Sequence, residues 1–360
     1  MPESKIVTTC SFWKDFRLCR EKMNLRYNEE LVPLETPEAL RFGSLAHKAL
    51  EVWDATRDSR KALEYLDSVF AAMAPGDHKE LEMLLRLQAI VANYAKVYWD
   101  EDVRTLSLNG KPALEVKFEI PILNPETGSA SRTFVLAGKI DRIVEYPQHP
   151  GECWILEKKT ATTIDADYLE RLWIDFQNHL YAHAARVMWN LNVIGVLYDV
   201  IQKPGLKLGE GESEEEYYVR RELLLLKSKT GKTTAKRQMR EEPEAYHKRL
   251  DEWYADTEAL KSDGIYRVRP DRFHRQRMEV TPVQIRKIQE ELWDLTKQYL
   301  DSQARGYFAM NTDSCFRWNN PCVYWKACRS GKDEFVMKNY YKHSPRNEEL
   351  LDASASKTTP

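Results

Sequence analysis

The sequence predicts an α/β fold in which a central mixed sheet is flanked by helices. Three observations support this prediction. Apolar residues recur every three or four positions in the first hundred residues, which is the period of a helix with one buried face. In the middle of the chain they alternate with polar residues, as they do in strands. Toward the end the helical period returns, so helical regions are expected on both sides of the sheet.

Composition places the chain among globular proteins. Hydrophobic residues make up 42% of its 360 residues, which is enough to bury a sizeable core. The first residues carry no basic segment followed by an apolar stretch, and no apolar run approaches the roughly 20 residues of a spanning helix. We therefore expect a cytoplasmic protein without membrane contact. Because the formal net charge is only −2, any site for nucleic acid must be a local patch.

The first region, residues 1–103, is expected to be helical. Its apolar periodicity predicts helices over residues 37–56, 58–73 and 77–102. Pro75 and the glycine after it separate the last two helices, because proline and glycine interrupt helices.

The second region, residues 104–226, is expected to hold the sheet. A turn-rich segment separates its first two strands, so the first three strands should form a meander. The elements predicted here are strands over 113–120, 132–144 and 152–159, a helix over 165–190, and strands over 193–201 and 217–226. The acidic run from Glu210 to Glu216 is expected in a loop.

The remaining chain divides into a third region, residues 227–330, and a polar tail, residues 331–360. The third region opens with a basic segment, 227–240, that has six basic and no acidic residues. Helices over 241–262 and 282–306 and a strand over 273–280 are predicted to follow, and then a cysteine-rich module. The tail is expected to be flexible.

Two carboxylates and a lysine form the most informative pattern. Asp141 lies on the second predicted strand, and Glu157 and Lys159 lie on the third. Side chains repeat every two residues along a strand, so Glu157 and Lys159 share a face and can converge with Asp141. Carboxylates bind Mg²⁺ or Mn²⁺, and a nearby ammonium supports phosphodiester hydrolysis. In a chain this rich in charges, the pattern alone is also compatible with a solvated charge run.

Two further motifs accompany this centre. The motif Phe42 to His47 lies in the first predicted helix and ends in a histidine, and Gln177 and Tyr181 lie one helical turn apart. In this order the four elements resemble the motifs of the RecB-like branch of the PD-(D/E)XK nucleases.

That resemblance implies a restriction-endonuclease-like core and a defined set of roles. It implies that Asp141, Glu157, His47 and the backbone carbonyl of Lys158 hold the metal. It also implies that Lys159 is catalytic and that two further residues organise the site and its DNA strand, Gln177 and Tyr181. Glu115, on the preceding strand, is a lesser candidate for the site. The alternative is that Glu115 is an exposed glutamate at the edge of the sheet.

Four cysteines are expected to hold a cofactor. Cys315, Cys322 and Cys328 lie within fourteen residues, and Cys19 precedes the histidine motif, as the lone N-terminal cysteine does in iron–sulfur members of this lineage, which include AddB-type and CRISPR-associated nucleases. Four thiolates suit a [4Fe–4S] cluster or zinc. The chain departs from those relatives by having six residues, not two, between the first two C-terminal cysteines. Cys10 is an alternative to Cys19.

The DNA contacts are expected from the basic runs, through Lys232, Lys236, Arg237, Arg272 and Arg275. No H-E-x-x-H or G-x-S-x-G motif is present, which gives no support to a metalloprotease or a serine hydrolase.

Together these features predict a metal-dependent DNA nuclease. The resemblance implies an exonuclease acting on DNA ends in recombination, repair or phage DNA processing, in a bacterial or phage-infected cell and with a possible recombination or helicase partner. The alternatives are a non-catalytic DNA-end-binding subunit stabilised by an iron–sulfur or zinc site, and a zinc-stapled interaction protein.

Overall fold

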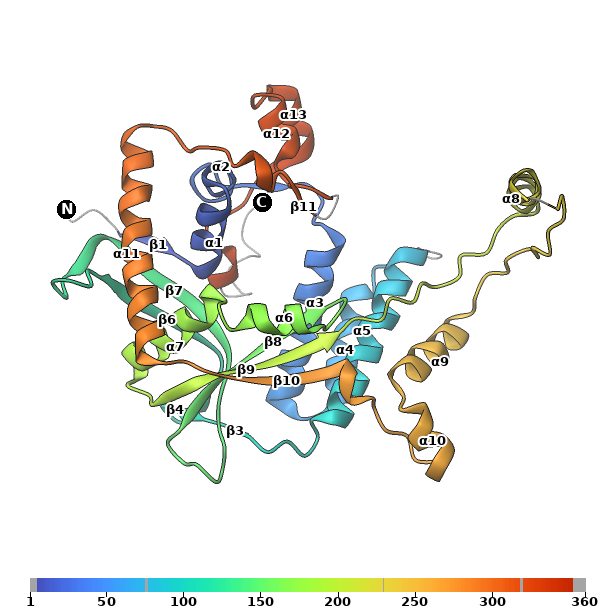
Figure 1. Ribbon diagram of the computed structural model, residues 1–360, viewed down its shortest axis with the longest axis horizontal. Helices are drawn as coiled ribbons and strands as arrows, with labels where there is room; N and C mark the ends of the chain where they lie inside the picture. The colour runs from blue at the N-terminus through green and yellow to red at the C-terminus, as the bar shows by residue number, and fades with distance from the viewer. Residues whose placement is uncertain (1–4, 75–76, 229, 318–319, 352–360) are drawn as a thin grey trace.

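A mixed sheet forms the centre of the computed structural model, which describes residues 5–74, 77–228, 230–317 and 320–351 (Figure 1). Within these residues the sheet has seven strands; its main path runs β1-β7-β8-β9-β10, and β3 and β6 pair with β7. β7 and β8 are antiparallel, whereas β8 and β9 are parallel. The strands are β1 (Ile6–Thr8), β3 (Arg104–Thr105), β6 (Leu114–Leu123), β7 (Ala130–Glu145), β8 (Cys153–Ala161), β9 (Val193–Gln202) and β10 (Phe273–Glu279).

Helices cover both faces of this sheet. Alternate residues of β9 belong to different cores, because Tyr198 packs with one set of helices and Ile201 with the other. The first set is α1 (Cys10–Leu18), α7 (Phe176–Trp189) and α11 (Pro282–Ala304). The second set is α3 (Glu38–Thr56), α4 (Ser59–Phe70), α5 (His78–Val97) and α9 (Pro243–Tyr254). This architecture confirms the predicted α/β class and agrees with a restriction-endonuclease-like core.

Most of the predicted elements are confirmed, including the three-strand meander β6-β7-β8. Two predicted helices are each divided in two. The helix predicted over 165–190 is α6 (Ala166–Leu172) and α7, because the Asp175 side chain caps α7 by accepting from the Gln177 N–H. The helix predicted over 241–262 is α9 and α10 (Thr257–Asp263), with Asp256 as the second cap. The break expected at Pro75 lies outside the described residues.

The strand predicted over 217–226 is wrong, because this segment is helical. It belongs to α8 (Glu214–Lys227), whose first turn includes the end of the acidic run that was expected in a loop. Ser213 and Glu216 form a capping box, and the leucines that follow are strong helix formers. Tyr217 to Val219 favour strands, and this local preference was misleading.

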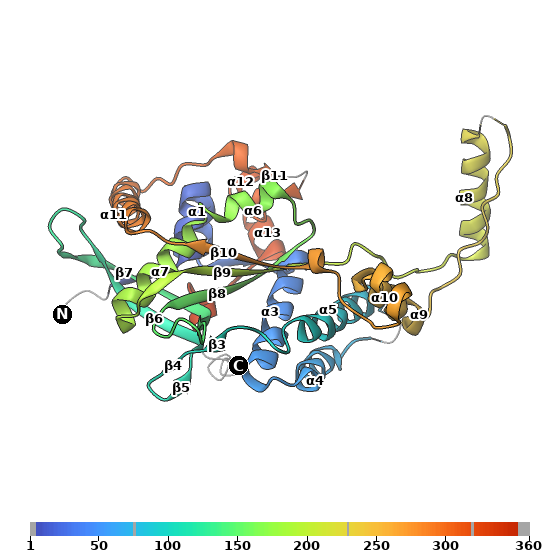
Figure 2. The same cartoon turned by 60° about the horizontal axis from the view of Figure 1, so that its bottom comes forward.

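α8 lies at the end of a projecting arm. The chain leaves the body after β9, reaches α8 through an extended segment, and returns through a second one to α9 (Figures 1 and 2). None of the residues of α8 is buried. We call residues 203–242 the arm.

The sheet draws on residues well outside the expected core, 104–226. β1 pairs in parallel with β7, and β10 pairs antiparallel with β9. The sheet therefore depends on segments on both sides of the expected core.

The two ends of the described chain pack together. β2 (Leu31–Pro33) pairs with β13 (Tyr341–His343), and Leu25 and Tyr324 share a small apolar core with them. Residues 331–351 are thus folded, in contrast to the expected flexible tail; residues 352–360 lie outside the described part. The other elements are α2 (Arg20–Met23), η1 (Asn24–Asn28), β4 (Ser107–Leu108), β5 (Lys111–Pro112), η2 (Pro270–Arg272), η3 (Thr312–Ser314), β11 (Phe316–Arg317), β12 (Asn320–Pro321), α12 (Trp325–Arg329), α13 (Glu334–Tyr340) and η4 (Glu348–Leu350).

Of the helices in the described chain, none is long and apolar enough to cross a membrane.

Candidate active site

The candidate site lies where β7 and β8 stop pairing. Their ladder joins residues 142–145 to residues 153–156, and Asp141 and Glu157 follow directly beyond it. The backbone N–H of Lys158 donates to Asp141 Oδ2 at 3.1 Å. The Asp141 side chain thus accepts a hydrogen bond from a backbone N–H that lies beyond the end of the β7–β8 ladder. The two carboxylates lie close together where the two strands stop pairing.

Glu157 is almost completely buried and is only half satisfied. Its Oε1 accepts from Lys159 Nζ at 2.5 Å and from Gln177 Nε2 at 2.8 Å. Its Oε2 is buried without a hydrogen-bond partner. Burial, and then the nearby charge of Asp141, raises the pKa of the Glu157 carboxyl. A buried acceptor without a donor destabilises a fold, so this oxygen is suited to receive a cation.

Lys159 faces the carboxylates as a cation. Burial alone would lower its pKa, but the charge and hydrogen bond of Glu157 outweigh burial, and the pKa of Lys159 is raised. Its ammonium therefore persists at neutral pH. Lys159 cannot act as a general base in this state, but it can stabilise negative charge.

Gln177 connects the acidic centre to two helices. Its Oε1 accepts from Lys159 Nζ and from Lys14 Nζ, each at 3.3 Å. Lys14 also forms an ion pair with Asp175, the cap of α7, at 2.8 Å. Neither Lys14 nor Asp175 was predicted from the sequence as a site residue. Asp175 could have been predicted as a helix cap from its position before α7. Lys14 lies on a helix far away in sequence, and nothing in the sequence indicates its contact with the site.

Tyr181 lies one turn after Gln177 and packs its ring edge-on against Phe118, with 5.7 Å between the ring centroids. Burial, and then the charge of Glu157, holds the pKa of Tyr181 well above its usual range. The space beneath these rings is tight, because a Cβ at Gly138 would lie 2.6 Å from Phe118. Tyr181 therefore forms a fixed wall of the site with a neutral hydroxyl.

His47 reaches the site from α3. Its Nδ1 lies 3.5 Å from Asp141 Oδ2. The structure thus brings together His47, Asp141 and Glu157 from three separate elements. The side chain of Lys158 points to the opposite face, so only its backbone is available to the site, as the resemblance implies.

Glu115 is close to the site but already has a partner. Its carboxylate forms an ion pair with Lys139. Its backbone has φ of 49°, in the left-handed region that a glutamate rarely adopts. It lies between the β6 residues that pair with Ile140 and Arg142, so it interrupts the ladder opposite Asp141.

The donors here suit a hard divalent cation, since the Asp141 carboxylate and the His47 imidazole lie near the buried, unpartnered oxygen of Glu157. Among the described residues, no group of three or more His, Cys, Asp or Glu side chains is arranged to hold a metal ion.

A comparison with protein families agrees with this geometry. The model of the PD-(D/E)XK nuclease superfamily matches residues 8–329. The chain belongs to the PD-(D/E)XK nuclease superfamily. The match spans both helical layers and the sheet of this nuclease-superfamily chain. None of the curated proteins compared with it matches.

Two of the expected DNA contacts in this PD-(D/E)XK chain are occupied by other side chains. Arg275 forms two hydrogen bonds with Asp199, at 2.6 and 2.8 Å, and a third with Glu101. Arg272 donates to Gln202 and lies over the ring of Trp253. Both guanidinium groups are thus engaged inside the protein.

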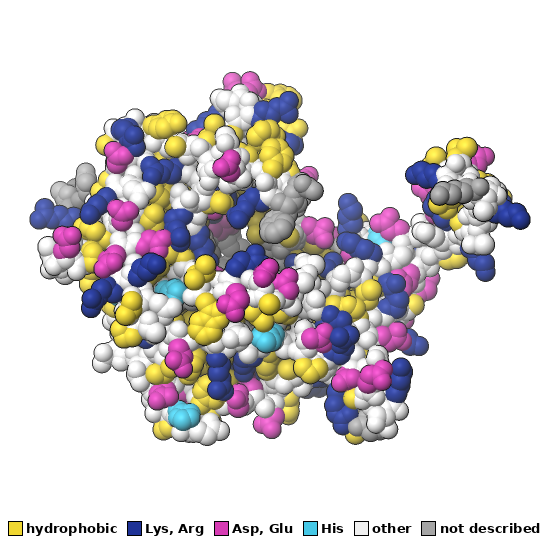
Figure 3. Space-filling model, viewed as in Figure 1, with side chains coloured by type: hydrophobic (Ala, Val, Ile, Leu, Met, Phe, Trp, Pro, Cys, Tyr) yellow, Lys and Arg dark blue, Asp and Glu magenta, His cyan; other side chains and the backbone are white. Residues whose placement is uncertain are grey.

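The other three candidate DNA contacts lie exposed on the returning segment of the arm: Lys232, Lys236 and Arg237. Figure 3 shows basic side chains around the end of the arm. Arg237 Nε donates to the backbone oxygen of Glu212.

The four cysteines proposed for the cofactor lie near one another. Asn311 contacts two of them, because its N–H donates to Cys19 Sγ at 3.4 Å and its carbonyl oxygen lies 3.8 Å from Cys315 Sγ. Cys322 donates its N–H to the carbonyl of Cys315. Burial raises the pKa of Cys328 to about 11, and Glu21 and the other three cysteines contribute further.

Cys10, the alternative to Cys19, lies in the main core instead. Burial raises its pKa to about 12, and the charge of Lys14 offsets part of this effect. Cys153 is buried in the same core.

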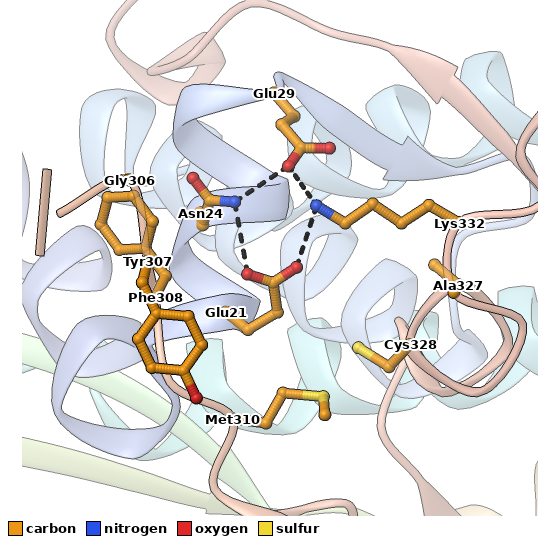
Figure 4. A pocket seen from close by; sticks show the side chains of 11 residues that line it. Glu21, Asn24, Glu29, Gly306, Tyr307, Phe308, Met310, Ala327, Cys328 and Lys332 are labelled. Atoms are coloured by element: carbon orange, nitrogen blue, oxygen red, sulfur yellow. Dashed lines mark hydrogen bonds and ion pairs between the residues drawn. The ribbon is translucent and has the colours of Figure 1, made fainter.

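A cavity of about 480 Å³ adjoins Cys328 (Figure 4). Lys332 Nζ bridges Glu21 at 3.0 Å and Glu29 at 2.5 Å, and Asn24 donates to both carboxylates. These groups satisfy one another, so the cavity has few free polar ligands. The ion pairs tie the C-terminal segment to α2 and η1 without any metal.

Mn²⁺ is expected to raise the melting temperature of the metal-free protein, and more so at a higher pH than at a lower one. The folded pKa of Glu157 is raised, so protonation on the acid side stabilises the metal-free fold and competes with the cation. As pH rises through that pKa, the proton is lost and Mn²⁺ takes its place. Calorimetry at both pH values measures the difference. Glu157→Gln should abolish it, and an unchanged Mn²⁺ effect in this variant would contradict the assignment.

Proposed function

We propose that this chain is a Mg²⁺- or Mn²⁺-dependent deoxyribonuclease that removes nucleotides from DNA ends, in recombination, repair or phage DNA processing. The observation that carries the proposal is the buried, unpartnered Glu157 Oε2 beside Asp141 and His47. Membership in the nuclease superfamily supports it. The action on ends and the biological process extend from the resemblance to RecB-like exonucleases.

The metal ligands in this proposal are His47, Asp141, Glu157 and the backbone carbonyl of Lys158. A metal bound there would neutralise the scissile phosphate and lower the pKa of a water molecule. Lys159 supplies a permanent positive charge beside the same phosphate. Gln177 holds both Lys159 and Glu157 in place through its amide.

The nuclease proposal is tested with labelled linear and circular DNA, incubated with Mg²⁺ or Mn²⁺ and protein purified without air. The wild type should shorten the linear DNA only when metal is present. Asp141→Ala removes a metal ligand, and Lys159→Ala removes the charge at the phosphate, so each should slow cleavage by at least about a hundredfold. Absence of metal-dependent cleavage by the wild type would refute the nuclease function. Full cleavage by both variants would refute the assignment of the active-site residues.

The arm is proposed to hold the DNA backbone through Lys232, Lys236 and Arg237, which are exposed and lie on one segment. Each phosphate contact releases counterions, so binding should weaken steeply with salt. Replacing all three by alanine should reduce the slope of log affinity against log salt by about 2 to 3.

Fluorescence anisotropy with labelled DNA at several salt concentrations measures this slope. A matched triple substitution of exposed lysines outside the arm, at Lys61, Lys79 and Lys261, should leave it close to that of the wild type. Equal slopes for the two triple variants would rule out the arm as a DNA contact.

Cys19, Cys315, Cys322 and Cys328 are proposed to hold a [4Fe–4S] cluster, with zinc as the alternative. Their proximity supports this proposal, as does their place between the two chain ends. A cofactor there would act as a structural staple, because metal binding and folding are thermodynamically coupled.

Protein purified without air should absorb visible light through thiolate-to-iron transitions. Cys322→Ser should lose this absorbance and melt at a lower temperature, because one of four ligands is gone. Cys153→Ser, which changes a buried cysteine away from the module, should keep the absorbance. A colourless wild-type protein that contains one equivalent of zinc would refute the iron–sulfur assignment, but the structural role of the four cysteines would stand.

A further inference from the structure

A set of buried charges lies directly behind the candidate active site, on the opposite face of the same strands. Side chains alternate along a strand, so Arg142 and Lys158 point away from the face that carries Asp141 and Glu157. Each of the two basic side chains is only 4% exposed. The two residues next to the carboxylates are therefore buried cations.

One carboxylate of α3 contacts both of these cations. Asp54 Oδ2 accepts a short hydrogen bond from Lys158 Nζ. Asp54 Oδ1 forms an ion pair with Arg142 Nη1 at 3.5 Å, and neither of these two buried atoms has a hydrogen-bond partner. The side chain of Asp54 is 2% exposed. Lys158 is on β8 and Arg142 is on β7, so Asp54 bridges the strands just where their own ladder ends.

The same helix carries His47. Asp54 follows it by seven residues, which is about two turns, so both side chains project toward the sheet. α3 crosses the sheet beside β8 (Figure 2). Asp54 thus ties to β7 and β8 the helix that brings His47 to Asp141.

The charges extend across the sheet as an ordered row. Lys158 is in register with Asp199 on β9, and Asp199 is in register with Arg275 on β10. Tyr94 Oη donates to Asp199 at 2.6 Å, and Arg142 Nη1 lies 2.6 Å from Glu101 Oε1. The partners of Asp54 therefore face further buried charges on both sides.

Stability alone does not explain this arrangement. Buried ion pairs are often no more stabilising than apolar residues of the same size, because desolvation offsets their attraction. What ion pairs do supply is a fixed geometry, since each charge has few positions in which it is paired. Their location behind two carboxylates that repel each other is where a fixed geometry is needed.

We propose that Asp54 is a positioning residue for the metal site: through Lys158 and Arg142 it fixes the separation of β7 and β8 and the place of His47 above them. The proposal rests on the proposed function, because the site it positions is the metal site described above. Asp54 touches neither metal nor DNA in this arrangement.

The test measures Mn²⁺ affinity by electron paramagnetic resonance in protein without DNA, at a temperature where calorimetry finds every variant folded. Asp54→Asn keeps the size and removes the charge, and it should weaken Mn²⁺ binding by about tenfold or more. The matched control is Glu82→Gln. Glu82 is a carboxylate of α5 whose side chain is 10% exposed and pairs with Arg86 and Lys207 away from the site. It should lower stability and leave Mn²⁺ affinity unchanged.

Lys158→Met is the second variant. If Asp54→Asn does not fold, Lys158→Met tests whether Asp54 positions the metal site. It removes the partner of Asp54 but leaves the backbone carbonyl, and it should also weaken Mn²⁺ binding by about tenfold. The double variant should bind about as well as either single variant, because both disrupt one connection.

Wild-type Mn²⁺ affinity in a folded Asp54→Asn protein, or in Lys158→Met if the first does not fold, would overturn the proposal. So would a fully additive double variant. A wild type that binds Mn²⁺ but cuts no DNA would refute the nuclease function alone, and the comparison of Mn²⁺ affinities would still decide the role of Asp54.

Discussion

Two carboxylates held close together in a buried position are the constraint on which this structure depends. Asp141 and Glu157 repel each other, and burial raises the cost, as the raised pKa of Glu157 records. On one face, Lys159 and Gln177 offset that cost through charge and hydrogen bonds. On the other face, buried ion pairs fix the strands that carry the acids. Two like charges can be kept close together at a functional site, because a bound cation offsets their repulsion.

The second constraint is the connection of the chain ends. β1 extends the sheet, while α1 supplies Lys14 to Gln177, so the N-terminal segment belongs to the site as well as to the fold. The same segment meets the C-terminal module through the β2–β13 pair and the Lys332 ion pairs. The four cysteines lie at this junction. A cofactor bound there would stabilise α1, and through it the hydrogen-bonded amide of Gln177.

The arm follows different physical rules from the body. Its helix buries no residue, so its form rests on local signals: a capping box, three glutamates in the first turn and a run of leucines. Elsewhere tertiary packing selects the structure. The wrong strand assignment at Tyr217 to Val219 illustrates the difference, since aromatic and β-branched residues favour strands chiefly when a sheet is there to receive them.

The sequence by itself determined the α/β class, the meander and the convergence of Asp141, Glu157 and Lys159, because the two-residue repeat of a strand decides which side chains share a face. It also indicated His47 and Gln177, through family resemblance. Only the tertiary structure decided which groups compensate the buried charges. Lys14, Asp54 and Asp199 come from elements far apart in the chain, and their pairing depends on how helices pack on the sheet. The same packing pairs Arg272 and Arg275 with acceptors inside the protein, because a buried guanidinium group must form hydrogen bonds.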